Sequence, residues 1–148
     1  MPGFKNDGVQ VQEYVYDFDV DGGATGAIDL SAKAGKADLP VGAIINAVRA
    51  KVVTACTSGG SATVVWGPTA DADGYSGATI AVASLTDNAL FNGWDNAAAL
   101  LWDDTNDHAI SYNVTAAANA DLNMTIATAA LTAGKIIFFV EYYVPSLT

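Results

Sequence analysis

The run from Gly134 to Pro145, GKIIFFVEYYVP, is the part of the sequence that most constrains the fold. It is rich in β-branched and aromatic residues between a glycine and a proline, so it predicts a β-strand covered on both faces. Successive side chains of a strand point to opposite faces. One face carries Ile136, Phe138, Val140, Tyr142 and Val144, and the other carries Ile137, Phe139, Glu141 and Tyr143. The first set is expected to face a hydrophobic core. The second set contains a charge and is expected to face a neighbouring subunit.

A second long alternating stretch spans residues 43–57. Val48, Ala50 and Val52 fall on one face, whereas Arg49 and Lys51 fall on the other. These two belong to only six basic residues in the chain. Two interpretations remain open: a solvated face, or a face that contacts acidic groups of a neighbour. The predicted oligomer interface combines both stretches and consists of Ile137, Phe139, Glu141, Tyr143, Arg49 and Lys51.

The remaining segments predict an all-β protein, an antiparallel β-sandwich of about eight strands with a jelly-roll-like or immunoglobulin-like arrangement. Further strands are expected at residues 9–20, 27–30, 62–66, 78–85, 109–116 and 122–128, with a phase slip at residues 12–13 that indicates a β-bulge or a break. Residues 58–61, SGGS, predict a hairpin between adjacent strands, and residues 131–134, LTAG, predict a tight turn. A long loop or short helix is expected at residues 86–108. Residues 1–11 are expected to form a flexible arm before a single domain at residues 12–148.

The charge of the chain disfavours several partner classes. The sequence of 148 residues has a net charge of −10, so nucleic acid and anionic membrane surfaces are unlikely partners on electrostatic grounds. No apolar run approaches the roughly 20 residues that a bilayer span needs, and no signal peptide is visible. The expected location of synthesis is therefore a cytoplasm. Cys56 is the single cysteine, so it cannot form an intramolecular disulfide, and it is expected to be buried.

The sequence contains no convincing catalytic or metal-binding motif. Thr69, Asp71, Asp73 and Gly74 imitate the start of a calcium loop, but position 80, where a bidentate glutamate belongs, is an isoleucine. A second acidic cluster contains Asp103, Asp104, Asp107 and His108, the only histidine. A metal site would need a second histidine or ligands from another element, and any histidine-based acid–base pair or Ser-His-Asp triad would have to use this one histidine. The cluster is therefore expected to be solvated and to cap backbone donors. We therefore expect no catalytic residues, no cofactor, no metal and no enzymatic activity.

Four stretches together resemble the small β-sandwich decoration, or cement, proteins of tailed-phage heads. They are the polar N-terminal arm, the block LPVGAIINAVRAKVVTACTSGGSATVVWG at residues 39–67, the segment ATIAVASL at residues 78–85, and the closing LTAGKIIFFVEYYVP at residues 131–145. The resemblance covers about two thirds of the chain. It implies a homotrimer that binds the major capsid protein on the outer surface of the virion and bridges neighbouring capsid subunits.

The same resemblance implies a role for the N-terminal arm. The arm would add a strand to an exposed sheet edge of the capsid, and the residues assigned to this contact are Phe4, Lys5, Val9 and Val11. An alternative is a head-fibre or tail-fibre module that recognises a surface glycan or receptor. In that case Trp94 and Trp102 would form a sugar-stacking platform, whereas in the first case they would form a lid over the core.

Overall fold

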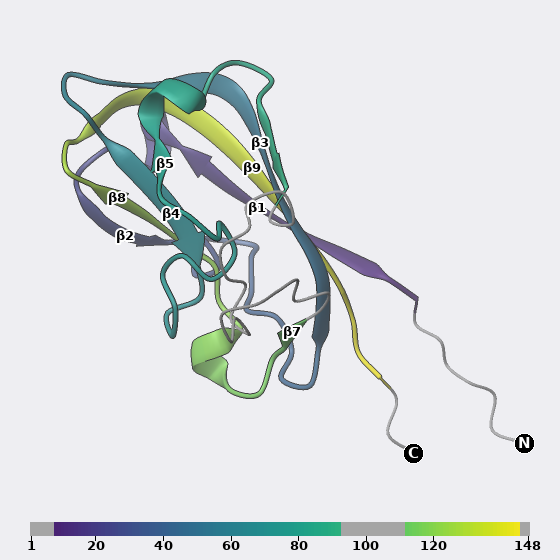
Figure 1. The fold of residues 1–148 in the computed structure, drawn as a ribbon. Coiled ribbons are helices and arrows are strands. Elements are labelled where there is room, and N and C mark those ends of the chain that lie inside the picture. Colours follow the sequence, from purple (N-terminus) through teal and green to yellow (C-terminus); the bar gives the residue numbers. More distant parts are fainter. Residues whose placement is uncertain (1–7, 93–111, 146–148) are drawn as a thin grey trace, which may run out of the picture.

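The computed structural model describes residues 8–92 and 112–145, which fold into two facing antiparallel sheets (Figure 1). The strands are β1 (Gln10–Asp17), β2 (Gly26–Asp29), β3 (Ile44–Ser58), β4 (Thr63–Gly67), β5 (Ile80–Ala81), β6 (Leu90–Asn92), β7 (Tyr112–Asn113), β8 (Asn123–Ala127) and β9 (Leu131–Tyr143). The helical pieces are single turns: α1 (Phe18–Asp21), η1 (Val82–Ser84) and η2 (Ala117–Asn119). Within these residues no helix has the length and hydropathy that a membrane span requires.

The strand order confirms the predicted sandwich and its jelly-roll character. One sheet has the order β1-β9-β3-β6, with the short β7 also paired to β3, and the other has the order β2-β8-β4-β5. Without the short β7, eight strands remain, and β8 and β9 are the seventh and eighth of them in chain order. One sheet then has the order first, eighth, third, sixth, and the other has the order second, seventh, fourth, fifth. This alternation between two packed sheets is the strand order of a jelly roll. The sheets are called here the β9 sheet and the β8 sheet.

The two longest strands, β3 and β9, form the centre of the β9 sheet (Figure 1). The predicted alternation of β9 is confirmed, because Ile136, Phe138 and Val140 are fully buried between the sheets. From β3, Val48, Ala50 and Val52 face the same core. From β4 and β8, the core receives Val64, Trp66, Met124 and Ile126. Each sheet therefore contributes to the core the apolar residues at alternate positions of its strands.

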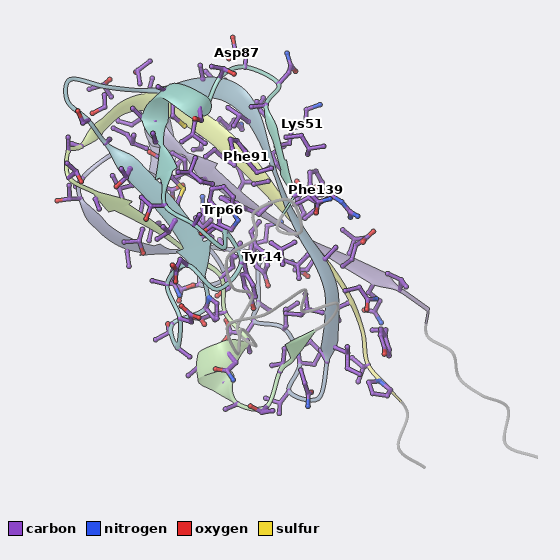
Figure 2. All side chains as sticks on the ribbon, viewed as in Figure 1. Tyr14, Lys51, Trp66, Asp87, Phe91 and Phe139 are labelled. Atoms are coloured by element: carbon purple, nitrogen blue, oxygen red, sulfur yellow. The ribbon has the colours of Figure 1, made fainter. Side chains whose placement is uncertain are left out.

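An aromatic cluster joins the two sheets at the middle of the sandwich (Figure 2). Trp66 of β4 makes edge-on contacts with Phe138 of β9 and Phe91 of β6, with ring centroids 5.4 Å and 5.8 Å apart. These are favoured aromatic geometries. The position of Phe91 also shows that the short β6 places its central residue in the core, opposite Ala50. The adjacent Leu90 and Asn92 of β6 therefore lie on the outer side.

The predicted hairpin at residues 58–61 is wrong. The loop follows β3, which belongs to the β9 sheet, and leads to β4, which belongs to the β8 sheet. The partners of β4 are β5 and β8, and β3 pairs with β9. The glycines and serines reverse the chain as predicted, but the reversal carries it across the core to the opposite sheet.

The first strand is shorter and more regular than predicted. β1 pairs with β9 in a continuous register from Gln10↔Tyr142 to Asp17↔Lys135, so neither a bulge nor a break occurs at residues 12–13. The strand ends at Asp17, whose carboxylate accepts a hydrogen bond from the Asp19 N–H and caps the turn α1. Residues 18–20, which are predicted to continue the strand, therefore belong to the helical turn α1.

Three other segments differ from the predictions. In the segment 78–85 only Ile80–Ala81 is a strand, and Val82–Ser84 form a 3₁₀ turn. The segment 86–108 begins with a strand, Leu90–Asn92, where a loop or helix was expected, and its residues 93–108 lie outside the described part. The predicted turn at residues 131–134 is the start of β9 itself.

Gly134 explains how β9 continues where a turn was predicted. Its φ of +139° lies in a region that favours glycine, and a Cβ at this position would lie 2.4 Å from the Cys56 Sγ. The glycine thus permits a close approach of β9 to β3, where the register between the two strands shifts. Burial raises the pKa of the Cys56 thiol to about 11, and the side chain is buried as predicted.

Candidate interaction surface

The side of the β9 sheet that points away from the core is the candidate functional surface, and we call it the outer face. It is formed by odd-numbered residues of β1, of the central part of β3 and of β9 from Lys135 onward, and by the two outer residues of β6. The set comprises Val11, Glu13, Val15 and Asp17 of β1, Lys135, Ile137, Phe139, Glu141 and Tyr143 of β9, Arg49, Lys51 and Val53 of β3, and Leu90 and Asn92 of β6. All six residues of the predicted oligomer interface lie on this face.

Apolar side chains on the outer face retain contact with solvent. Ile137 and Phe139 are half-buried, and Leu90 is 63% exposed. Figure 2 shows Phe139 and Lys51 on the outside of the β9 sheet, whereas Trp66 lies between the sheets. A row of neighbouring residues, Val15, Ile137, Lys51 and Leu90, crosses the four strands in register. The outer face therefore combines apolar and charged side chains on neighbouring strands.

The predicted basic pair on β3 meets an acidic group of the same chain. The Arg49 Nη1 donates a 2.8 Å hydrogen bond to the Glu141 Oε2 on β9. Both side chains are about one third exposed, so the pair lies at the surface and is open to solvent screening. Lys51 is exposed, and the described residues provide no ion-pair partner for it. Arg49 therefore forms an intramolecular ion pair, and a contact of this face with a neighbour stays a prediction.

A second ion pair lies at the end of the outer face. The Lys135 Nζ is 3.1 Å from a carboxylate oxygen of Asp17 on β1. The hydrogen bond from Lys135, assisted by the one from the Asp19 N–H, lowers the pKa of Asp17 below its ordinary value. The strands of the outer face thus carry three basic residues, Arg49, Lys51 and Lys135, and three acidic residues, Glu13, Asp17 and Glu141. This face is neutral in a chain with a net charge of −10.

Comparison with known proteins identifies the fold. No protein-family model and no curated protein matches the sequence. A chain of the cyanophage Pam1 capsid asymmetric unit is similar, with 21% identity, a TM-score of 0.58, and coverage of 93% of this chain and 85% of that chain. A chain of the acidic stable capsid structure of Helicobacter pylori bacteriophage KHP30 is also similar, with 19% identity, a TM-score of 0.51, and coverage of 93% and 89%. The fold is one that occurs in phage capsids.

The structure places only part of the predicted arm. Phe4 and Lys5 lie outside the described residues. Val9 precedes β1 and is 61% exposed, and Val11 lies within β1, opposite Glu141, and is 57% exposed. The last two residues of the expected arm, Gln10 and Val11, are thus paired in the β9 sheet of the capsid-like fold.

The segment at residues 69–74, which resembles the start of a calcium loop, is held in place by a buried polar cluster that the sequence did not predict. The Thr69 N–H and hydroxyl both donate to the Asp121 carboxylate, at 2.9 Å and 2.5 Å, and the Asn123 side-chain amide donates to the same carboxylate at 2.7 Å. Both hydrogen-bond donors of Thr69 are therefore bound to the Asp121 carboxylate. Asp121 and Thr69 are far apart in the sequence, and the only signal was that Asp121 stands directly before an apolar strand.

The two acidic residues of that loop lie close to each other. Partial burial, and next a hydrogen bond with Asp73, raise the pKa of Asp71 above its ordinary value. Within residues 8–92 and 112–145 no group of three or more His, Cys, Asp or Glu side chains is arranged to hold a metal ion. The second acidic cluster, Asp103 to His108, and the tryptophans Trp94 and Trp102 lie outside the described residues.

Proposed function

We propose that this protein is a structural component of a phage virion. It binds the outer surface of the capsid and bridges neighbouring major capsid subunits, as a decoration or cement protein does. The observation that carries the proposal is the likeness to chains of two phage capsid structures over 93% of this chain, that is, over the whole sandwich. The role requires binding surfaces and no catalysis.

We further propose that the protein acts as a homotrimer that associates through the outer face. Copies of a chain with a net charge of −10 repel one another, so association is favoured where the surface charge cancels. The outer face is such a place, and it offers half-buried Ile137 and Phe139 together with the exposed Leu90. A symmetric oligomer would present several copies of each capsid contact, and multivalent attachment strengthens weak single contacts.

The N-terminal arm supports attachment in this proposal. Because Gln10 and Val11 belong to β1, the segment that is available to reach a capsid subunit ends at Val9. Phe4 and Lys5 would supply an apolar and a basic contact. A deletion of residues 1–8 therefore tests the arm without shortening β1, whereas a longer deletion would remove strand pairing with β9.

The proposal is tested with expanded shells assembled from the major capsid protein of the phage that carries this chain. Purified protein is expected to bind these shells saturably and to raise the temperature at which they rupture. Light scattering is expected to give three times the mass of one chain. The variant without residues 1–8 is expected to fold and trimerise but to bind shells less tightly. A full-length protein that leaves the shells unoccupied would contradict the proposed function.

A further inference from the structure

The first strand of the β9 sheet has one side that no strand of residues 8–92 and 112–145 covers. Within these residues β1 is an edge strand, because it pairs with β9 alone. The Asp17 N–H donates a 2.9 Å hydrogen bond to the carboxylate of Asp21, so it points away from β9. Backbone groups of an antiparallel strand alternate in direction, and the β1–β9 register has no shift. The N–H and C=O groups of Val11, Glu13 and Val15 therefore point to the same free side.

The second half of this edge is capped by the chain itself. The Lys33 Nζ donates a 2.8 Å hydrogen bond to the Val15 carbonyl and a second one, also 2.8 Å, to Asp21. Together with the bond between Asp21 and the Asp17 N–H, these contacts close the edge from Val15 to Asp17. Proteins commonly protect exposed sheet edges with a charged side chain in this way, because an open edge pairs with other chains.

The first half of the edge has no such protection. Among the described residues no partner meets the backbone groups of Val11 or the Glu13 N–H, and the Glu13 carbonyl receives only a 3.5 Å contact from the Gln12 side-chain amide. Val11 is 57% exposed. Figure 1 shows this end of β1 extending past the body of the sandwich.

We propose that the edge of β1 from Val11 to Glu13 accepts an extended segment of the capsid subunit as an additional strand. This inference rests on the proposed function and adds a second contact, in which the partner supplies the strand. Backbone hydrogen bonds would give affinity, and side chains at alternate positions would give specificity. The partner is expected to place a basic residue opposite Glu13 and an apolar residue opposite Val11.

Charge argues for this occupant over a second copy of the chain. The stretch from Gln10 to Val15 carries one charge, the Glu13 carboxylate, and the whole chain carries −10. A second copy would bring the same acidic edge to this site, and its net charge would oppose the approach. A segment with a lysine or arginine would instead form a cross-strand pair with Glu13.

Proline at position 13 tests the edge with little change to the sheet. Because the Glu13 N–H points away from β9, E13P removes a free donor and blocks strand addition while the β1–β9 bonds remain. E13A is the matched control, since it removes the same side chain and keeps the N–H. We expect E13P to bind capsid shells at least about tenfold more weakly than E13A, a loss of about 1.4 kcal/mol, and to have the same oligomeric mass as E13A. We also expect E13K to bind more weakly than E13A.

Amide hydrogen exchange on the wild-type protein gives a second measurement that does not depend on how E13P folds. The N–H groups of Val11 and Glu13 are expected to exchange more slowly once the protein is bound to shells. Equal shell affinity of E13P and E13A, or unprotected amides in the bound state, would overturn the proposal while leaving the proposed function intact. A loss of oligomer mass in E13P with unchanged shell affinity would assign the edge to a second copy and would also overturn it. Failure of the wild-type protein to bind shells would reject both.

Discussion

The Arg49 guanidinium of β3 lies 2.8 Å from the Glu141 carboxylate of β9, directly beside Phe139 on the outer face. The two residues are 92 positions apart in the sequence, and the sequence predicts both at an oligomer interface. Because the charge of Arg49 is balanced within the chain, the half-buried Phe139 lies next to a neutral pair. This lowers the electrostatic cost of covering the centre of the outer face with a second copy.

The contribution of the Arg49–Glu141 ion pair to the stability of the fold can be measured with the variant R49A. The pair is about one third exposed at each end, so its loss is expected to cost less than about 1 kcal/mol, or up to about 4 °C in Tm for a chain of this size. The difference from wild type should disappear in high salt. K51A, which removes a cation for which the described residues provide no partner, is expected to leave Tm nearly unchanged. A loss of more than about 3 kcal/mol in R49A would show that the pair is part of a buried network.

The oligomer interface is tested by F139D. Phe139 is half-buried on the outer face, so a charge there should prevent a second copy from covering it without disturbing the core residue Phe138 beneath. We expect light scattering to give the mass of one chain and circular dichroism to give the wild-type spectrum. T125D is the matched control, because it places the same charge on the outward side of β8 in the opposite sheet and should leave the mass unchanged. An unchanged mass in F139D would exclude this interface.

The sequence predicted the strands better than it predicted their partners. Alternation in β9 located both of its faces because the buried set, from Ile136 to Tyr142, is apolar without interruption. The loop at residues 58–61 was assigned to a hairpin because glycine and serine report a chain reversal, which is needed equally for pairing within one sheet and for crossing to the other. β6 was missed because three residues are too few to establish a period of two.

The polar contacts of the fold were less predictable for a different reason. Thr69 and Asp121 are 52 positions apart, and nothing in the local sequence of either residue signals the other. The calcium-loop imitation arose because the oxygen-bearing residues of residues 69–73 alternate, although the first one is held by Asp121. Likewise, the outward residues of the exposed and capped halves of β1 are similar, valine and then an acidic residue in each, and the difference at the edge comes from Lys33, which is 18 positions from Val15.

The close approach of β9 and β3 is tested by G134A. The added Cβ would lie 2.4 Å from the Cys56 Sγ and 3.0 Å from the Cys56 Cα, and φ is +139° at this position. Steric overlap with a backbone atom and an unfavourable φ are expected to cost about 3 kcal/mol together, which corresponds to a fall of roughly 6–12 °C in Tm. G59A is the control, because nothing lies within 4 Å of its added Cβ. A wild-type Tm in G134A would show that β9 can shift at this point without cost.

The last prediction concerns the pH dependence of stability and uses D71N. The folded-state pKa of Asp71 is raised above its ordinary value of 3.8, chiefly by burial and next by the hydrogen bond with Asp73. A carboxyl with a raised folded pKa binds its proton more tightly in the folded state, so its contribution to stability falls as the pH rises through that pKa. The variant lacks this penalty, and we expect its Tm at pH 7 to exceed that of wild type by about 1–2 °C, because the carboxyl is mostly screened by solvent.

The advantage of D71N should shrink as the pH falls through the raised folded pKa of Asp71, and it should be lost below 3.8, where the Asp71 carboxyl of the wild type is protonated in both states. D19N is the matched control, since it removes the same charge from an exposed carboxyl and so corrects for the smaller net repulsion of a less acidic chain. Melting curves of the three proteins between pH 3 and pH 7 are the measurement. If D71N and D19N differ from wild type by the same amount at every pH, the gain comes from net charge alone, and the contact between Asp71 and Asp73 carries no specific penalty.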